Sequence, residues 1–332
     1  MRNFKIFILL LFIISNCAAV YAQQTQGDDV IKIDSSIVRL NVGVVDRQGR
    51  PITNLSKENF SLFEDGVKQN ISRFEPTVAP FSVVMLLDMS GSTLGFREVI
   101  RQSAFRFIDA LAPEDRVAVV EFYDKVNLRN DFTTSRKIIG NSIVSANGRG
   151  KTQLYKALDF ALDKLSKEGK RRKAIIVLTD GVDSSARDED RNFLEKLKES
   201  DVANALKPET SSALNRTLTK SDAQGVTIYP LALPTGDPFK LAEPTPLQMA
   251  MYSASRARLQ MLAERTGGTF NAINHLEDMG KLYASVAADL RALYTIEYSP
   301  ADIKRDGKWR AIKIEVNNDE LVSRTRPGYF AK

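Results

Sequence analysis

The 332-residue sequence contains one cysteine, Cys17, and one histidine, His275. A lone cysteine cannot form an intramolecular disulfide, and if it is removed with an N-terminal signal no thiolate site is left. The sequence has no zinc motif, no nucleophile elbow and no pair of catalytic carboxylates. We expect His275, which precedes a predicted helix, to be a surface or capping residue. A hydrophobic core, with or without a bound metal, must therefore stabilise the fold.

Long apolar runs are also scarce. Residues 6–14 form an uninterrupted apolar run of nine residues, well below the roughly 20 that a membrane-spanning helix needs. The run follows Arg2 and Lys5 and precedes small residues that end at Ala22, which is the layout of a secretory signal. We therefore predict that residues 1–22 are removed and that the protein is exported to the periplasm or the extracellular space.

Cys17 leaves one alternative to full secretion. The sequence Ile14-Ser15-Asn16-Cys17 resembles a bacterial lipoprotein signal. In that case the cysteine would carry a lipid, and the protein would contact a membrane through this anchor alone.

Basic residues do not form a long run with interleaved aromatic residues, so we do not expect nucleic acid as a partner. Loss of Arg2 and Lys5 with the signal would lower the formal charge from +6 to +4. The short basic segment at residues 171–173 is expected to precede a strand or to cap a helix.

The segment Gly148-Arg149-Gly150-Lys151-Thr152 ends like a phosphate-binding loop. The phosphate-loop pattern requires a glycine where this chain has Ser145, and it requires a strand before the loop. Residues 135–145 instead predict a short amphipathic helix. We therefore do not expect a nucleotide, and we expect Lys151 to point to solvent and Thr152 to have another role.

The middle of the chain predicts strands that alternate with helices, which indicates a parallel sheet covered on both faces. The predicted strands are residues 81–87, 117–122, 174–178 and 226–233. The predicted helices are residues 97–111, a helix that starts at 152, one around 254–265 and one at 276–293. The segment at residues 187–224 is very polar and longer than a simple crossover connection, and we expect a solvated helix and a mobile loop there. Asp183 and residues 188–190 are expected on a solvated face.

The two flanks of this region have β patterns. Residues 34–74 and 294–325 contain short strand candidates, with an Asp65-Gly66 hairpin signal in the first flank. Neither flank alone has enough apolar strand to bury a core, so we predict that the flanks pair with each other in one small β-sandwich. The alternative is two separate hairpins. The predicted domains are residues 30–78 and 294–332 for the sandwich and residues 80–293 for the central domain.

Oxygen-bearing side chains follow two of the predicted buried strands. The first strand is followed by Asp88-Met89-Ser90-Gly91-Ser92, and strand 174–178 is followed by Thr179-Asp180-Gly181. Thr152 precedes a helix that should begin at the same edge of the sheet. In a doubly wound sheet, ligands bind at the carboxyl ends of the strands, where the strand order reverses.

These motifs, in this order, resemble the metal-ion-dependent adhesion site of the von Willebrand factor type A domain. The resemblance covers residues 80–293, and all of its site positions are filled: Asp88, Ser90, Ser92, Thr152 and Asp180. The flanks are similar to those of a bacterial secreted subgroup in which β segments bracket the domain. The resemblance implies an α/β fold with a doubly wound, mainly parallel, Rossmann-like sheet.

The resemblance also implies how a metal would be held. Ser90, Ser92 and Thr152 would contact a divalent cation directly, and Asp88 and Asp180 would act mostly through bound water. Such oxygens suit a hard ion, Mg²⁺ first, with Mn²⁺ or Ca²⁺ as alternatives.

Neutral hydroxyl ligands would leave the charge of the ion partly uncompensated. The hypothesis is a binding module, not an enzyme, whose metal accepts an Asp or Glu carboxylate of a protein partner. Two alternatives stay open: a structural component of the cell envelope with a weak or empty metal site, and a metal-dependent hydrolase.

Overall fold

The computed structural model describes residues 37–77, 79–169, 171–235, 237–238, 241–273 and 279–331, without the side chains of residues 279–281. Residues 36–332 form one compact unit. The predicted signal at residues 1–22, Cys17 and His275 lie outside the described residues. None of the helices in the described ranges has the length and apolar character needed to cross a membrane.

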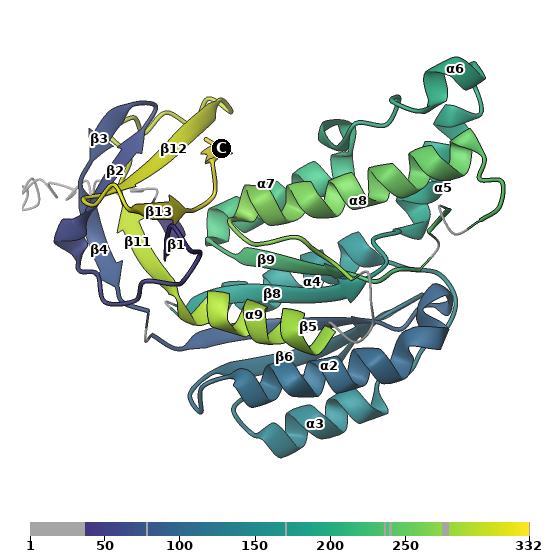
Figure 1. Cartoon of the computed structure of the whole chain (residues 1–332), viewed down its shortest axis with the longest axis horizontal. Coiled ribbons are helices and arrows are strands. Elements are labelled where there is room, and N and C mark those ends of the chain that lie inside the picture. The colour runs from purple at the N-terminus through teal and green to yellow at the C-terminus, as the bar shows by residue number, and fades with distance from the viewer. Residues whose placement is uncertain are drawn as a thin grey trace, which may run out of the picture. The chain divides into compact units, whose positions relative to one another are not determined.

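A six-stranded sheet forms the centre of the fold (Figure 1). Its strands are β5 (Phe81–Asp88), β6 (Arg116–Phe122), β7 (Val126–Thr133), β8 (Arg172–Thr179), β9 (Thr227–Ala232) and β10 (Asn271–Ala272). The order is β10-β9-β8-β5-β6-β7, and only β7 is antiparallel to its neighbour. The chain continues from β5 to β6 on one side and later to β8 on the other, so the strand order reverses at β5. The predicted doubly wound, mainly parallel sheet is confirmed.

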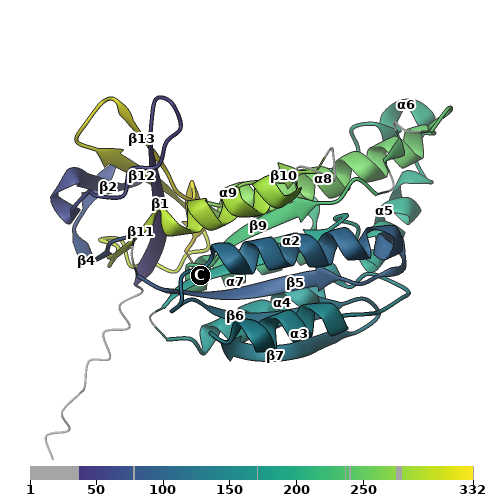
Figure 2. The same cartoon turned by 60° about the horizontal axis from the view of Figure 1, so that its bottom comes forward.

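Helices cover both faces of this sheet (Figures 1 and 2). Val83, Met85 and Leu87 of β5 pack in one core with α2 (Arg97–Ala110), α3 (Arg136–Ser145) and α9 (Met279–Arg291). Val84 and Leu86 pack in the other core with α4 (Leu154–Ser166), α7 (Ser212–Gln224) and α8 (Pro246–Thr266). Successive strand residues point to opposite faces, so a strand buried on both sides must be apolar throughout.

The two flanks pair with each other, as predicted, and the alternative of two separate hairpins is wrong. One sheet has the order β13-β1-β11-β4 and the other β14-β12-β2-β3. The strands are β1 (Val38–Asp46), β2 (Phe60–Glu64), β3 (Val67–Gln69), β4 (Ile71–Glu75), β11 (Leu293–Tyr298), β12 (Trp309–Val316), β13 (Leu321–Arg324) and β14 (Gly328–Phe330). Strands of both sheets share one apolar core that includes Leu40, Leu62 and Ile314. The domain boundaries stay a prediction, because residues 36–332 form a single unit.

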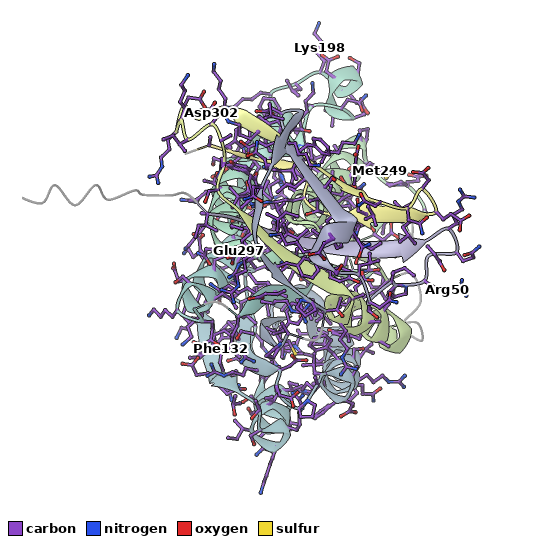
Figure 3. The ribbon with its side chains drawn as sticks, turned by 90° about the vertical axis from the view of Figure 1, so that its left-hand side faces the viewer. Arg50, Phe132, Lys198, Met249, Glu297 and Asp302 are labelled. Atoms are coloured by element: carbon purple, nitrogen blue, oxygen red, sulfur yellow. The ribbon has the colours of Figure 1, made fainter. Side chains whose placement is uncertain are left out.

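Buried polar contacts join the sandwich strands to the α/β part. Asn41 of β1 donates hydrogen bonds to the Gly225 carbonyl (3.2 Å) and to the Thr227 hydroxyl (2.9 Å). Arg39 of β1 donates to the Arg171 carbonyl and to the carboxylate of Glu297 on β11, a residue that is labelled in Figure 3. These contacts satisfy polar groups that are shielded from water.

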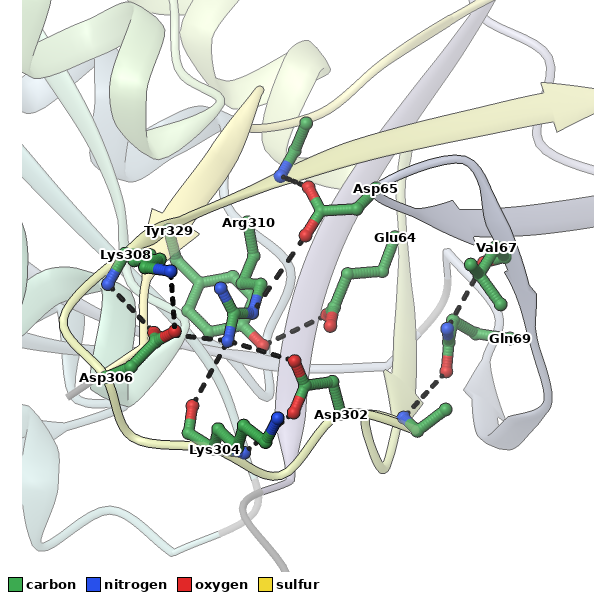
Figure 4. Close-up of polar contacts among 12 residues, drawn as sticks. Glu64, Asp65, Val67, Gln69, Asp302, Lys304, Asp306, Lys308, Arg310 and Tyr329 are labelled. Atoms are coloured by element: carbon green, nitrogen blue, oxygen red, sulfur yellow. Dashed lines mark hydrogen bonds and ion pairs between the residues drawn. The ribbon is translucent and has the colours of Figure 1, made fainter.

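A cluster around Arg310 of β12 fixes the loop that precedes this strand (Figure 4). Its guanidinium lies 3.3 Å from a carboxylate oxygen of Asp302 and 3.2 Å from one of Asp306, and it donates to the Lys304 carbonyl. Nearby, the Glu64 carboxylate accepts hydrogen bonds from the hydroxyls of Tyr298 and Tyr329. The loop before β12 is therefore held by charge as well as by the strand ladder.

Residues 187–224 contain more helix and more buried side chains than predicted. They hold most of α5 (Ser184–Leu194), then α6 (Glu199–Val202), the 3₁₀ helix η3 (Pro208–Thr210) and α7. Leu194 and Val202 pack against Ala250 of α8, and Leu214 of α7 lies in the core beneath the sheet. The prediction of a solvated helix fits α5, which is mostly exposed. Where a loop was predicted, the chain instead forms α6 and η3, and a few apolar residues attach this polar segment to α8.

Candidate metal-binding site

Asp88, the last residue of β5, is fully buried. One carboxylate oxygen accepts the Ser90 backbone N–H (3.0 Å), and the other accepts the Thr179 hydroxyl (2.7 Å). The Ser90 hydroxyl lies 3.1 Å from the Ser92 hydroxyl. The turn after β5, which leads into the 3₁₀ helix η2 (Gly91–Phe96), thus places one carboxylate and two hydroxyls together.

Asp180 directly follows β8 and is also buried. Its carboxylate accepts the Val182 backbone N–H (3.0 Å) and the Thr235 hydroxyl (2.9 Å). Thr152 and Ser184 exchange two hydrogen bonds, since the N–H of Thr152 donates to the Ser184 hydroxyl and the N–H of Ser184 donates to the Thr152 carbonyl, both at 2.9 Å. This exchange ties the loop that carries Thr152 to the turn that follows Asp180.

One cavity of about 460 Å³ receives side chains from all three loops: Ser92, Thr152 and Asp180 are among its lining residues. The Ser90 hydroxyl contacts the Ser92 hydroxyl and so joins this group. The Asp88 carboxylate is connected to it through a hydrogen bond from Thr179, which precedes Asp180 in the chain. The structure therefore brings the predicted residues to one place, at the carboxyl ends of β5 and β8, although they are far apart in the chain.

The glycine loop closes against the turn after β5. The Gly91 N–H donates to the Gly150 carbonyl at 3.0 Å. Gly150 has φ +96°, and a Cβ there would overlap the Asp124 carboxylate, which accepts the Lys151 N–H at 2.6 Å. The Lys151 side chain is exposed, and the segment before the loop is the helix α3, as predicted.

Arg97 is a positioning residue that the sequence patterns did not indicate. Its guanidinium donates to the carbonyls of Met89 (2.8 Å) and Gly148 and to the side chain of Asn147 (2.6 Å). It therefore links the turn after β5 to the glycine loop. No local signal identifies it, because an arginine at the start of a helix has no characteristic spacing to either loop.

The electrostatics of the site favour a cation. Burial, first, and the nearby charge of Asp180 raise the pKa of Asp88 to about 7, against the lowering effect of hydrogen bonds from Ser90 and Thr179. Neither Asp88 nor Asp180 forms an ion pair with a described residue. Two close carboxylates without a cationic partner are costly in a buried place, and a divalent ion would relieve that cost.

The chemistry of the donors fits a hard ion that is bound largely by hydroxyl oxygens. Within the described ranges, no group of three or more His, Cys, Asp or Glu side chains could hold a metal. A metal at Asp88 and Asp180 would therefore need further oxygen ligands, which Ser90, Ser92 and Thr152 could supply. Mg²⁺ sites typically combine one or two carboxylates with several bound waters.

Two acidic residues expected on a solvated face lie elsewhere. Asp183 is buried and caps α5, where its carboxylate accepts the N–H groups of Ser185 and Ala186. Asp190 is buried and binds Arg258 of α8 in a bidentate pair at 2.6 and 2.7 Å. For Asp183 and Asp190 the prediction is wrong, because each carboxylate has a partner that a run of acidic residues does not reveal. Asp188 and Glu189 are exposed, as predicted.

A family model agrees with the central α/β part of the fold. The family model described as the von Willebrand factor type A domain matches residues 83–182. The chain thus contains a von Willebrand factor type A domain, a class that includes adhesion and protein-interaction modules. The comparison with curated proteins gave no match.

Solved structures similar to the chain share little sequence with it. A von Willebrand factor type A protein from Catenulispora acidiphila is 13% identical, with 91% of this chain and 64% of that chain covered and a TM-score of 0.49. The von Willebrand factor domain of the type V pili tip protein Mfa5 from Porphyromonas gingivalis is 16% identical, with 63% and 94% covered and a TM-score of 0.45. A mussel byssus protein, proximal thread matrix protein 1, whose structure has a zinc-occupied metal-ion-dependent adhesion site, is 15% identical, with 66% and 47% covered and a TM-score of 0.47.

Proposed function

We propose that this protein is an exported binding module that holds a divalent cation, Mg²⁺ first and Mn²⁺ or Ca²⁺ as alternatives, at Asp88, Ser90, Ser92, Thr152 and Asp180. Through that cation it binds an Asp or Glu side chain of a protein partner. The observation that carries the proposal is the cavity shared by Ser92, Thr152 and Asp180, with the buried Asp88 carboxylate beneath it.

Each group has a distinct part in this proposal. The hydroxyls of Ser90, Ser92 and Thr152 would hold the ion, and Asp88 and Asp180 would hold its waters. When bound, the ion supplies a positive charge that neutral hydroxyls leave partly uncompensated. Around these groups, Arg97 and Ser184 fix the loops through hydrogen bonds to the backbone, and Thr179 fixes the Asp88 carboxylate.

The residues of this site support catalysis less well than binding. Among the described residues that line the cavity there is no histidine, cysteine or lysine, and the Asp190 carboxylate is held by Arg258. Histidine is the side chain that most often acts as a general base, and a base must lie within reach of the proton that it removes. We therefore assign the site to binding.

The test is a metal titration followed by a binding assay. Calorimetry of the native chain with Mg²⁺ or Mn²⁺ should give a single-site isotherm, and Asp180→Ala should abolish it. Immobilised native protein should then retain a partner from the organism's envelope fraction in Mg²⁺ and release it in chelator. A native chain that gives no heat with either ion contradicts the proposal. Asp131→Ala is the matched control, since Asp131 is an exposed aspartate paired with Lys164.

A further inference from the structure

The cavity at the candidate metal site continues into a groove between two helices. Arg187 and Arg191 of α5 line it on one side, and Gln248, Met251 and Tyr252 of α8 line it on the other. The spacings of three and four residues place each set on one face of its helix. The groove is thus built from helix faces and not from loops alone.

A buried ion pair fixes the width of this groove. Asp190, between the two arginines on α5, binds Arg258 of α8 through two hydrogen bonds at 2.6 and 2.7 Å. Each partner neutralises the other, so Asp190 does not cancel the charge of Arg187 or Arg191.

The remaining charge of the groove wall is positive. Arg191 is exposed and forms no ion pair within the described ranges, and Arg187 has only a loose pair with its neighbour Asp188 at 3.6 Å. Both guanidinium groups can therefore receive a carboxylate from a ligand. The opposite wall offers the partly buried Met251 and Tyr252 for apolar contact.

The helix geometry sets the distance between the two ends of the groove. Ser184, the first residue of α5, is hydrogen-bonded to Thr152 at the metal site. Arg191 follows seven residues later, so it lies about 10 Å along the helix at ~1.5 Å per residue. An extended peptide covers that distance in about three residues at ~3.3 Å each.

We propose that the partner segment carries two acidic residues separated by two others, at least one of which is apolar. The first acid binds the metal, the second binds Arg187 and Arg191, and the apolar side chain packs on Met251 and Tyr252. This inference rests on the proposed function, because it needs the metal to fix the first acid.

The test uses two synthetic peptides and the full chain loaded with Mg²⁺. The first peptide is acetyl-Gly-Glu-Phe-Gly-Glu-Gly-amide, and in the second the distal Glu is replaced by Gln. Affinities are measured by NMR titration for the native protein, for Arg187→Gln/Arg191→Gln and for the control Lys207→Gln/Arg216→Gln. The control removes two exposed positive charges outside the groove lining.

We expect the doubly acidic peptide to bind the native protein about three to ten times more tightly than the singly acidic one. The advantage should disappear in Arg187→Gln/Arg191→Gln and persist in the control. The groove variant should keep native Mg²⁺ affinity and native affinity for the singly acidic peptide, which shows that it is folded.

The outcomes separate the two proposals. If chelator abolishes binding of the singly acidic peptide but the second acid adds nothing, or if its advantage survives in the groove variant, the groove inference alone is wrong. If neither peptide binds the metal-loaded native protein, or if chelator has no effect on binding, the proposed function is wrong and the inference is overturned with it.

Discussion

At the scale of single residues, Asp88 couples the metal site to pH. Its pKa of about 7 lies above the ordinary value of 3.8, so in the metal-free protein its carboxyl group favours the folded state only while protonated. That contribution is complete below about pH 4 and is lost as the pH rises through about 7. A cation favours the ionised form, so its stabilising effect should grow over the same range.

The variant Asp88→Asn should therefore remove both this pH dependence of stability in the metal-free protein and the stabilisation by the cation. We expect thermal unfolding in chelator to show the native protein losing stability relative to the variant as the pH rises from about 4 through about 7, by on the order of a few kcal/mol. With Mg²⁺ the native protein should gain stability over that range and the variant should not.

Asp131→Asn is the control for this experiment, because its carboxylate pairs with Lys164 at the surface and its pKa is lowered, first by that hydrogen bond. It should keep the Mg²⁺ response at every pH. A native protein whose stability relative to Asp88→Asn does not change with pH contradicts the prediction.

Thr179 gives a second prediction. Its buried hydroxyl donates to Asp88 at 2.7 Å and also accepts the Gly181 N–H at 3.1 Å. Thr179→Val keeps the shape but removes that hydrogen bond from the carboxylate, so we expect Mg²⁺ affinity to fall about tenfold with the fold intact. Calorimetry measures the affinity. Thr217→Val removes a buried hydroxyl of α7 that is bonded only to a backbone carbonyl, and unchanged metal affinity is expected there.

The sequence predicted the candidate metal-binding residues better than it predicted the residues that position them by hydrogen bonds. Asp88 and Asp180 could be located because each follows an apolar strand, and parallel strands end at the same edge of a sheet. Arg97 and Thr235 could not, because their partners come from segments that only the tertiary fold brings near. Whether the gathered residues bind a metal stays a prediction.

At the scale of the elements, the glycine loop depends on Gly150. Its φ of +96° is strained for other residues, and a Cβ would overlap the Asp124 carboxylate. Gly150→Ala should displace the loop that carries Thr152, lowering Mg²⁺ affinity severalfold and stability by about 1–3 kcal/mol. Calorimetry and thermal unfolding measure the two effects.

Gly307→Ala separates strain from overlap, because Gly307 has φ +71° with no atom within 4 Å of the added Cβ. This variant should lose stability and keep full metal affinity. If both glycine variants bind Mg²⁺ as the native protein does, the loop does not need Gly150 to form the site.

The elements were predicted well where both faces are buried and poorly where one face is exposed. Strand β7 was missed because it is an edge strand of mostly polar residues, in which only Phe132 is buried. Helix α8 begins at Pro246, before the predicted start, where Thr245 and Gln248 form a capping box that the apolar pattern does not reveal.

At the scale of the whole molecule, the pairing of the two flanks could be predicted, because neither flank alone has enough apolar strand to bury a core. The register did not follow, because β1 pairs with β11 across more than two hundred residues and nothing local specifies that partner. The polar junction with the α/β part also escaped prediction. Residues 171–173 were expected to precede a strand or to cap a helix, but Arg172 and Lys173 are the first residues of β8 itself. Arg172 in that segment is buried and acts at the junction.

The chain passes between the sandwich and the α/β part twice, before β5 and at the start of β11, and Arg172 is hydrogen-bonded to both of these segments. Its guanidinium donates to the carbonyls of Thr77 and Ala79 before β5 and to that of Leu293 at the start of β11, and it stacks 3.9 Å from the centre of the Phe81 ring. One side chain thus satisfies backbone groups of both crossings. We infer that it couples the unfolding of the two parts.

Arg172→Met should leave these carbonyls unpaired and cost on the order of 3–5 kcal/mol. In calorimetric scans we expect one transition for the native protein, raised as a whole by Mg²⁺, and two for the variant, of which Mg²⁺ raises only one. Arg73→Met, at a more exposed arginine of β4 paired with Glu75, should keep the single transition. A single Mg²⁺-sensitive transition in Arg172→Met would show that the sandwich and the metal site communicate without this residue, because the strand ladder and the contacts of Asn41 would then be sufficient to couple them.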